Sequence, residues 1–180
     1  MSAESLPAAV FLDRDGTLIE DVGYPRDPGR VRLLVGVPGG LRRLAEAGFR
    51  LVVASNQSGI GRGIVSEDEA SAVHERFTAL LGDQGITLDG AKYCPHGPEE
   101  GCECRKPEPG LLLSAAGEIG LDLESSFMIG DKHSDVEAGR RAGCRTVLLG
   151  PPGADAGGAD HVAPDLAAAT DWVLAAGGRG

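Results

Sequence analysis

The chain has 180 residues and a formal net charge of −10 at pH 7, with 27 acidic and 17 basic side chains. A negative charge of this size argues against a nucleic-acid backbone as the partner, and no apolar run reaches the length of a membrane span. The length fits one domain over residues 1–180. The first seven residues have neither the basic start nor the apolar stretch of a secretory signal. We therefore expect a protein of the cytoplasm, and a monomer.

Short apolar runs and amphipathic segments alternate along the chain. The runs that favour buried strands are residues 8–12, 49–54, 91–93, 127–129 and 145–149. The segments with helical composition or capping are residues 38–47, 66–81, 109–119, a segment that ends at 141, and 165–176. Residues 19–32 and 151–159 are rich in Gly and Pro and are expected to be loops. The order predicts an α/β protein with a three-layer, Rossmann-like fold and a central parallel sheet.

Polar side chains follow three of the predicted strands. Asp13 and Asp15 follow the first, Ser55 follows the second, and Asp131 and Asp135 follow the fourth. Parallel strands bring their carboxyl ends to one edge of the sheet, so these groups would converge there. Carboxylates held close together need a cation or a shared proton, and hard oxygen ligands suit Mg²⁺ beside a phosphate. The pattern predicts a metal-assisted site for phosphoryl transfer.

These motifs resemble those of the haloacid dehalogenase-like phosphatases. Asp13-Arg14-Asp15-Gly16-Thr17 is similar to the first motif of that family, and Ser55 takes the place of its second-motif Ser or Thr. Lys106 matches the third motif, and Gly130-Asp131-Lys132 with Asp135 resembles the fourth. Asp135 fits either of two roles, support for a metal site or a partner for a lysine. The gaps between the motifs leave no room for a large cap domain.

The resemblance implies a role for each of the other side chains. Asp13 would attack phosphorus to give an aspartyl-phosphate. Asp15 would protonate the leaving oxygen and then activate water. Ser55 and Lys106 would stabilise the transferring phosphoryl group. Mg²⁺ would be held by the Asp13 side chain, the Asp15 carbonyl oxygen and Asp131.

A second cluster of metal-binding residue types lies in a loop of about residues 94–109. Three thiols and one imidazole fall within eleven residues, in the order Cys94, His96, Cys102 and Cys104. Four such ligands match a structural zinc site with no open position, and unmetallated thiols in a loop are the alternative. Zinc would fix a loop rich in Gly and Pro, and would thereby direct the following Arg105 and Lys106 towards the phosphate.

The zinc loop narrows the resemblance to a branch of the family with two activities, on heptose 1,7-bisphosphate and on histidinol phosphate. Residues 21–24 and 56–63 resemble the heptose enzymes, whereas the five residues between His96 and Cys102 match the histidinol phosphatases. We expect removal of the 7-phosphate of D-glycero-D-manno-heptose 1,7-bisphosphate. The substrate contacts that the likeness implies are Asp21, Val22, Gly23, Tyr24, Asn56, Gln57, Ser58, Arg62, Arg105 and Lys132.

Several alternatives stay open at this level. Histidinol phosphate is the competing substrate. A zinc-stapled binding module, which would use the acidic edge without catalysis, is the competing class of protein. The presence of Asp13 together with its supporting groups favours the enzyme. For two of the substrate contacts, Tyr24 fits a packed loop aromatic as well, and Arg62 fits a solvated charge.

Overall fold

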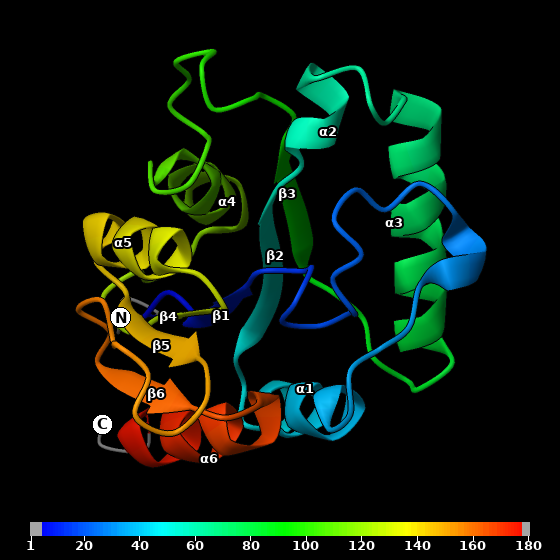
Figure 1. Ribbon diagram of the computed structural model, residues 1–180. Coiled ribbons are helices and arrows are strands. Elements are labelled where there is room, and N and C mark those ends of the chain that lie inside the picture. The colour runs from blue at the N-terminus through cyan, green and yellow to red at the C-terminus, as the bar shows by residue number, and fades with distance from the viewer. Residues whose placement is uncertain (1–4, 178–180) are drawn as a thin grey trace.

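The computed structural model describes residues 5–177, and at its centre lies a sheet of six parallel strands (Figure 1). The strands are β1 (Ala9–Leu12), β2 (Arg50–Asn56), β3 (Gly90–Cys94), β4 (Phe127–Gly130), β5 (Arg145–Leu149) and β6 (His161–Ala163). Their order across the sheet is β3-β2-β1-β4-β5-β6, and every neighbouring pair runs parallel. Residues 1–4 and 178–180, which the expected domain includes, lie outside the described residues.

The strands bury side chains on both faces of the sheet. Successive side chains of a strand point to opposite faces. Val10 and Leu12 of β1 therefore pack into one apolar core together with Phe127 of β4, whereas Ala9 and Phe11 pack into a second core. A parallel sheet that is covered on both faces has strands that are apolar throughout. This burial explains why short continuous apolar runs marked β1, β2, β4 and β5 in the sequence.

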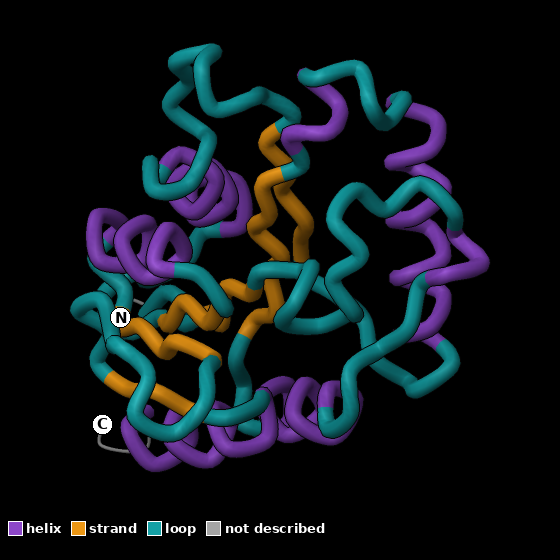
Figure 2. The backbone as a smooth tube through the Cα atoms, in the orientation of Figure 1, coloured by secondary structure: helices purple, strands orange, loops and turns teal. Residues whose placement is uncertain are grey.

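Helices cover the two faces as the outer layers of the predicted three-layer fold (Figure 2). One core includes side chains of α1 (Val37–Glu46), α3 (Glu67–Gly82) and α6 (Leu166–Gly177), and the other includes those of α4 (Gly110–Ile119) and α5 (His133–Ala142). The predicted capping box opens α3. The Glu69 N–H donates to Ser66 Oγ at 3.1 Å, and the Ser66 N–H donates to the Glu69 carboxylate at 2.9 Å.

The strand order creates a switch point between β1 and β4. The connection from β1 to β2 passes through α1 on one face, and the connection from β3 to β4 passes through α4 on the other. In open parallel sheets, ligands bind in the crevice outside the carboxyl ends of the strands at such a point. Asp13 directly follows β1 and Asp131 directly follows β4. The fold therefore brings two of the predicted acidic groups to this crevice.

Three short elements were not predicted. β6 has three residues and begins with a histidine, so it shows neither an apolar run nor clear alternation. The single turn α2 (Ser58–Gly61) contains two glycines, which disfavour a helix. The 3₁₀ turn η1 (Pro28–Arg30) lies inside the predicted loop of residues 19–32. Each is too short or too glycine-rich for periodicity to reveal it.

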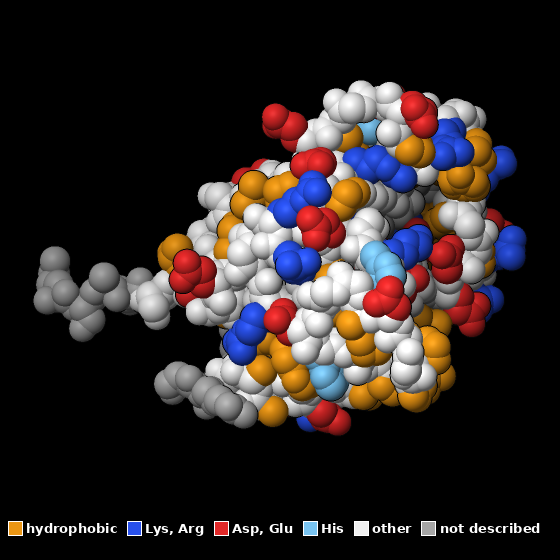
Figure 3. Space-filling model, turned by 60° about the vertical axis from the view of Figure 1, so that its left-hand side comes forward, with side chains coloured by type: hydrophobic (Ala, Val, Ile, Leu, Met, Phe, Trp, Pro, Cys, Tyr) orange, Lys and Arg blue, Asp and Glu red, His pale blue; other side chains and the backbone are white. Residues whose placement is uncertain are grey.

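The segments between the motifs carry only small elements in the described part of the chain. The segment from Thr17 to Ser55 contains η1, α1 and most of β2, and the segment from Ser55 to Lys106 contains α2, α3 and β3. Residues 5–177 therefore include no large cap domain. No helix in this range is both long enough and apolar enough to cross a bilayer. On the face drawn in Figure 3, acidic and basic side chains are interspersed rather than gathered by sign.

Candidate active site

The acidic cluster at the switch point consists of Asp13, Asp131 and Asp135. Asp13 follows β1, Asp131 follows β4, and Asp135 lies in the first turn of α5. One carboxylate oxygen of each residue lies within 4.8 Å of the other two. Gly16 has a φ of +83°, and a Cβ at this position would overlap the Asp131 carboxylate. Only glycine permits this close approach between the loop after β1 and the end of β4.

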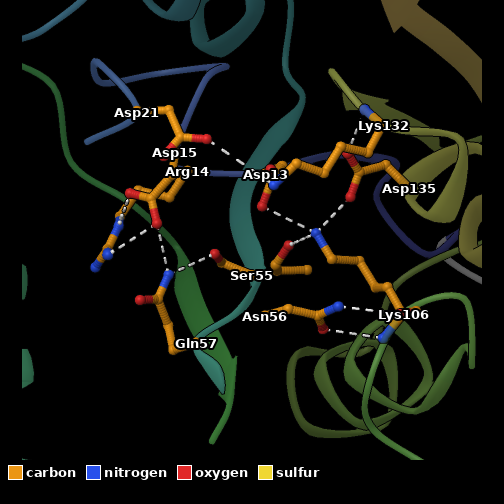
Figure 4. Close-up of polar contacts among 11 residues, drawn as sticks. Asp13, Arg14, Asp15, Asp21, Ser55, Asn56, Gln57, Lys106, Lys132 and Asp135 are labelled. Carbon is orange, nitrogen blue, oxygen red and sulfur yellow. Dashed lines mark hydrogen bonds and ion pairs between the residues drawn. The ribbon is translucent and has the colours of Figure 1, made fainter. Parts of the chain in front are cut away.

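Lys106 inserts its ammonium group into this cluster (Figure 4). Its Nζ donates hydrogen bonds to Asp13 Oδ1 at 2.9 Å, to Asp135 Oδ1 at 2.6 Å and to the Ala54 carbonyl oxygen at 2.7 Å. Burial alone would lower the pKa of Lys106, but the charges of Asp135 and Asp13 raise it above its ordinary value. The lysine is therefore a fully bonded cation. Of the two roles open for Asp135, the contact with a lysine is present.

The three carboxylates carry more negative charge than Lys106 balances. Burial raises the pKa of Asp131 to about 7, with further contributions from the charges of Asp13 and Asp135. Burial also raises the pKa of Asp135. At Asp13 burial acts in the same direction, but the charge of Lys106 and several hydrogen bonds together outweigh it and lower the pKa. Asp131 Oδ1 is buried and has no hydrogen-bond partner among the described residues. A buried, unpartnered oxygen beside a second carboxylate fits a divalent cation such as Mg²⁺.

Asp15 belongs to a separate ion pair at the edge of the cluster. Arg14 Nε donates to Asp15 Oδ1 at 3.0 Å, and Arg14 Nη2 donates to Asp15 Oδ2 at 3.3 Å. Gln57 Nε2 donates to both Asp15 Oδ2 and Ser55 Oγ, at 2.9 Å each. The predicted metal contact of Asp15 uses its carbonyl oxygen, so it would leave this side-chain pair intact.

A cavity of about 560 Å³ brings most of the predicted site residues together. Those that line it are Asp13, Asp15, Asp21, Gly23, Tyr24, Ser55, Asn56, Gln57, Ser58, Arg105, Lys106 and Lys132. Val22 lines a neighbouring cavity of about 380 Å³ instead, together with Glu69 of α3. Arg62 lines neither cavity, and its exposed side chain lies near Gly97 of the cysteine-rich loop. The structure thus separates two of the predicted substrate contacts from the rest.

Asn56, at the end of β2, uses both ends of its side-chain amide on the backbone of Lys106. Its Nδ2 donates to the Lys106 carbonyl oxygen at 3.0 Å, and its Oδ1 accepts from the Lys106 N–H at 2.9 Å. The sequence predicted a contact with substrate at this position. In the structure the amide fastens the segment that carries the buried lysine, and Asn56 also lines the cavity, so the substrate contact stays a prediction.

The four residues of the predicted zinc loop also converge. Their ligand atoms lie within 4.8 Å of one another, and five of the separations among the three Sγ atoms and His96 Nδ1 are between 3.0 and 3.6 Å. These separations exceed a disulfide bond of about 2.05 Å, and the cysteines are free thiols. A tetrahedral zinc ion, with bonds of about 2.0 to 2.3 Å, fits between such atoms.

The cysteine-rich loop forms one wall of the cavity. The Gln57 N–H, directly before α2, donates to the Cys94 carbonyl oxygen at 2.7 Å. Arg105 Nη1 donates to the His96 carbonyl oxygen at 3.2 Å, and Arg105 itself lines the cavity. The loop therefore orients Arg105 through its own backbone.

Some residues of the site were not singled out from the sequence. Arg14 was noted only as part of its motif, because charged side chains are seldom fully buried and nothing local shows that this one is. Pro107 and Ser134 line the cavity. Their positions directly beside Lys106 and Asp135 in the sequence were the available signal.

Comparison with known proteins agrees with this geometry. The HAD-hydrolase-like family model matches residues 103–169, which include Lys106, Asp131 and Asp135. A D-glycero-β-D-manno-heptose-1,7-bisphosphate 7-phosphatase of Yersinia pestis is 41% identical over 178 residues, which cover 95% of this chain and 91% of the relative. The protein of the same name from Escherichia coli K12 is 40% identical over 179 residues, which cover 96% and 90%. The chain belongs to the haloacid dehalogenase-like phosphatases.

Solved structures of haloacid dehalogenase-like phosphatases share its fold. The D,D-heptose 1,7-bisphosphate phosphatase from B. bronchiseptica, in complex with magnesium and phosphate, has a TM-score of 0.83 and 32% sequence identity. The match covers 94% of this chain and 99% of the other. The family, the three-layer fold and the phosphatase class predicted from the sequence are confirmed. The competing interpretation, a binding module without catalysis, is thereby set aside.

Proposed function

We propose that this phosphatase removes the 7-phosphate of D-glycero-β-D-manno-heptose 1,7-bisphosphate. The observation that carries the proposal is the meeting of Asp13, Asp131 and Lys106 beside an open cavity at the switch point of the sheet. The relatives that bear this name, at about 40% identity over nearly the whole chain, support the choice of substrate.

Two carboxyl groups of the site carry out the reaction: one forms a bond to phosphorus, and the other transfers the protons. Asp13 attacks phosphorus as a carboxylate, and the bond between phosphorus and the sugar oxygen breaks as the aspartyl-phosphate forms. Asp15 gives its proton to the departing oxygen, and later takes one from the water that attacks phosphorus. That second attack releases phosphate and regenerates the Asp13 carboxylate. Ser55 would hold a phosphoryl oxygen, and the positive charge of Lys106, bonded to Asp13, would stabilise the negative charge that builds up on these oxygens.

Mg²⁺ would be held by the Asp13 carboxylate, the Asp15 carbonyl oxygen and Asp131, whose unpartnered Oδ1 is available as a ligand. When bound, it would neutralise charge on the phosphoryl oxygens. The magnesium and phosphate in the related B. bronchiseptica enzyme support this proposal. Asp135 bonds through one oxygen to Lys106 at 2.6 Å, and through the other to the backbone N–H just before α5 at 3.0 Å. It therefore acts by orienting the lysine.

The cavity wall offers contacts for the rest of the sugar phosphate. Asp21, Tyr24 and Ser58 line it with polar groups that suit sugar hydroxyls, and Arg105 and Lys132 bring positive charge that suits a second phosphate. No cap domain covers the cavity in the described part of the chain, so a sugar-sized molecule has access without a lid movement.

We infer a structural zinc ion at Cys94, His96, Cys102 and Cys104. All four positions of a tetrahedral ion would be taken by the protein, so zinc there would have no position left for substrate or water. Its effect would be to hold the loop from which Arg105 and Lys106 follow.

The test compares kcat/KM for the β and α anomers of the heptose bisphosphate and for histidinol phosphate, by release of inorganic phosphate. We expect the β anomer to exceed histidinol phosphate by at least about tenfold, because only the bisphosphate can use both cationic side chains of the wall. The product should retain its phosphate at C1. A higher kcat/KM on histidinol phosphate, or release of the C1 phosphate first, would overturn the proposed substrate.

A further inference from the structure

Arg14 is a buried cation to which the mechanism above gives no role. Its exposed fraction is 2%, and among the described residues the carboxylate that forms an ion pair with it is Asp15. Its guanidinium meets both oxygens of Asp15, at 3.0 and 3.3 Å. A planar guanidinium that binds at two points fixes both the place and the plane of a carboxylate, which a lysine cannot do.

The guanidinium packs on one aromatic side chain, which in turn contacts a second. Arg14 Cζ lies 5.2 Å from the centroid of the Tyr93 ring, over its face. The Tyr93 hydroxyl is 2.7 Å from His74 Nδ1, and the two rings meet edge to face with centroids 5.3 Å apart. Tyr93 belongs to β3 and His74 to α3. Tyr93 of β3 therefore supports an arginine from the loop after β1, and His74 of α3 supports Tyr93.

Arg14 separates Asp15 from a third cavity, distinct from the two described above. That cavity, of about 290 Å³, is lined by Arg14, Gln57, His74 and Tyr93 but not by Asp15, which faces the larger cavity. Gln57 lines both and donates to Asp15 Oδ2 at 2.9 Å. Arg14 and Gln57 thus approach Asp15 from the side away from the acidic cluster, and leave its other side towards the substrate.

The hydrogen bonds to Asp15 leave room for one proton. A carboxylate has about four lone-pair sites. Arg14 occupies one site on each oxygen, and Gln57 occupies a second site on Oδ2. The site that remains is on Oδ1. A proton carried there keeps its direction as long as the arginine holds the plane of the group.

We propose that Arg14 is a positioning residue for Asp15, braced by Tyr93 and His74, and that it directs the free Oδ1 site towards the leaving oxygen. This inference rests on the proposed function, in which Asp15 is the acid and the base. Without the two-point contact, the Asp15 carboxylate would turn in the cavity, and few of its orientations would meet the leaving oxygen. The effect of Arg14 is therefore confined to steps in which Asp15 moves a proton.

The test uses two phosphate esters that differ in their need for an acid. The alkyl substrate is the heptose bisphosphate, whose leaving oxygen must be protonated, and the aryl substrate is p-nitrophenyl phosphate, whose leaving group departs as an anion. For Arg14→Gln we expect kcat/KM on the alkyl ester to fall about a hundredfold, and on the aryl ester less than about fivefold. Tyr93→Phe, which keeps the ring but loses the bond to His74, should shift the same ratio by a few-fold. Equal losses on the two esters would overturn the inference.

A double-mutant cycle separates this inference from the proposed function. If Arg14 acts through Asp15, adding Arg14→Gln to Asp15→Asn should cause no further loss on the alkyl ester. Independent, multiplying losses would contradict the inference alone. If Asp15→Asn itself left the alkyl reaction unchanged, the proposed role of Asp15 would fail, and the two failures are thus distinguishable.

Two further variants control for folding. Arg43→Gln removes an arginine from an exposed pair with Asp171 and should change neither ester. If Arg14→Gln does not fold, as judged by circular dichroism and thermal melting, Arg14→Lys takes its place. It retains the charge that compensates Asp15 but lacks the planar fork, so the same selective loss on the alkyl ester is expected. Unchanged kinetics in a folded Arg14→Lys enzyme would overturn the inference.

Discussion

The two ligand clusters of this phosphatase are assembled in opposite ways. The acidic cluster takes Asp13 from the end of β1, Asp131 from the end of β4 and Asp135 from α5, so it exists only when the sheet has formed. The cysteine–histidine cluster takes its four members from eleven consecutive residues, with Cys94 at the end of β3 and the other three in the loop that follows it. The first depends on topology and the second on local chain geometry. A substitution in one cluster should therefore affect activity, stability and local hydrogen exchange differently from a substitution in the other.

The clusters also differ in how their charge is balanced. The acidic cluster contains a protein cation, because Lys106 lies between Asp13 and Asp135. The cysteine–histidine cluster has no cationic side chain among its four members, and burial raises the pKa of Cys94. Thiolates there would need a metal ion to balance them. The four predictions that follow test this difference, from the largest expected effect to the smallest.

Asp13→Asn should abolish the chemistry without touching the cysteine-rich loop. An amide is a poor nucleophile, so we expect phosphate release to fall at least about a thousandfold. Zinc content, measured by metal analysis, should stay the same. Asp83→Asn, which changes an exposed aspartate at the end of α3, is the matched control and should be fully active. Turnover near the wild-type rate in Asp13→Asn would contradict the nucleophile assignment.

Lys106→Met should damage stability and activity together. It leaves two buried carboxylates without their cation, which costs about 3 to 5 kcal/mol of unfolding free energy, and kcat should fall about a hundredfold. Urea unfolding and phosphate release measure the two effects. Lys132→Met is the comparison, because Lys132 is 59% exposed in its side chain and lies 4.0 Å from Asp21. Its cost in stability should stay below about 1 kcal/mol, and equal destabilisation of the two variants would speak against the role of burial.

Removal of the inferred zinc should have a local effect. With a zinc chelator or with Cys102→Ser, we expect faster amide hydrogen exchange over residues 94–106, little change in β1 and β4, and a loss of activity of about tenfold as Arg105 and Lys106 lose their fixed position. Cys144→Ser, a change at the thiol outside the cluster, is the control and should retain zinc. Full activity and unchanged hydrogen exchange in the metal-free protein would rule out the inferred structural role of zinc.

Asn56→Ala should produce the smallest change and decide between two interpretations of this residue. Loss of the two hydrogen bonds to the Lys106 backbone should lower stability by about 1 to 2 kcal/mol and lower kcat a few-fold, with KM nearly unchanged. Steady-state kinetics on the heptose bisphosphate measures the split. A raised KM with an unchanged kcat would instead support the predicted contact between Asn56 and the substrate.

The fold could be predicted from the sequence where burial leaves a local mark. β1 and β4 are apolar throughout, and β2 and β5 contain continuous apolar runs, because both faces of the sheet are covered. The Ser66–Glu69 capping box marks the start of α3. The meeting of the acidic groups followed from one topological rule, since residues at the carboxyl ends of parallel strands share an edge. Three residues of β6 and one turn of α2 are too short to leave such a mark.

The direction of individual side chains could not be predicted in the same way. Val22 and Arg62 stand in motifs that matched, but the structure places them outside the main cavity. The motif of Asn56 predicts a contact with substrate but gives no sign that both ends of its amide bond to Lys106, a residue far along the chain. Arg14 forms an ion pair with its own neighbour, Asp15, and its guanidinium lies over the Tyr93 ring. Each of these outcomes depends on contacts between distant segments, which a motif does not encode.

The central place of β1 in the sheet has a consequence for synthesis of the chain. Of the six strands, β1 is synthesised first, but its neighbour on one side is β4. Val10 can therefore pair with Phe127 only after β4 has been synthesised. If β1, β2 and β3 pair before β4 has been synthesised, the free edge of β1 consists of apolar residues alone, and such an edge favours association with other chains. Asp131 emerges directly after β4. We therefore expect catalytic competence to arise only once β4 has paired with β1, because this pairing brings Asp131 beside Asp13.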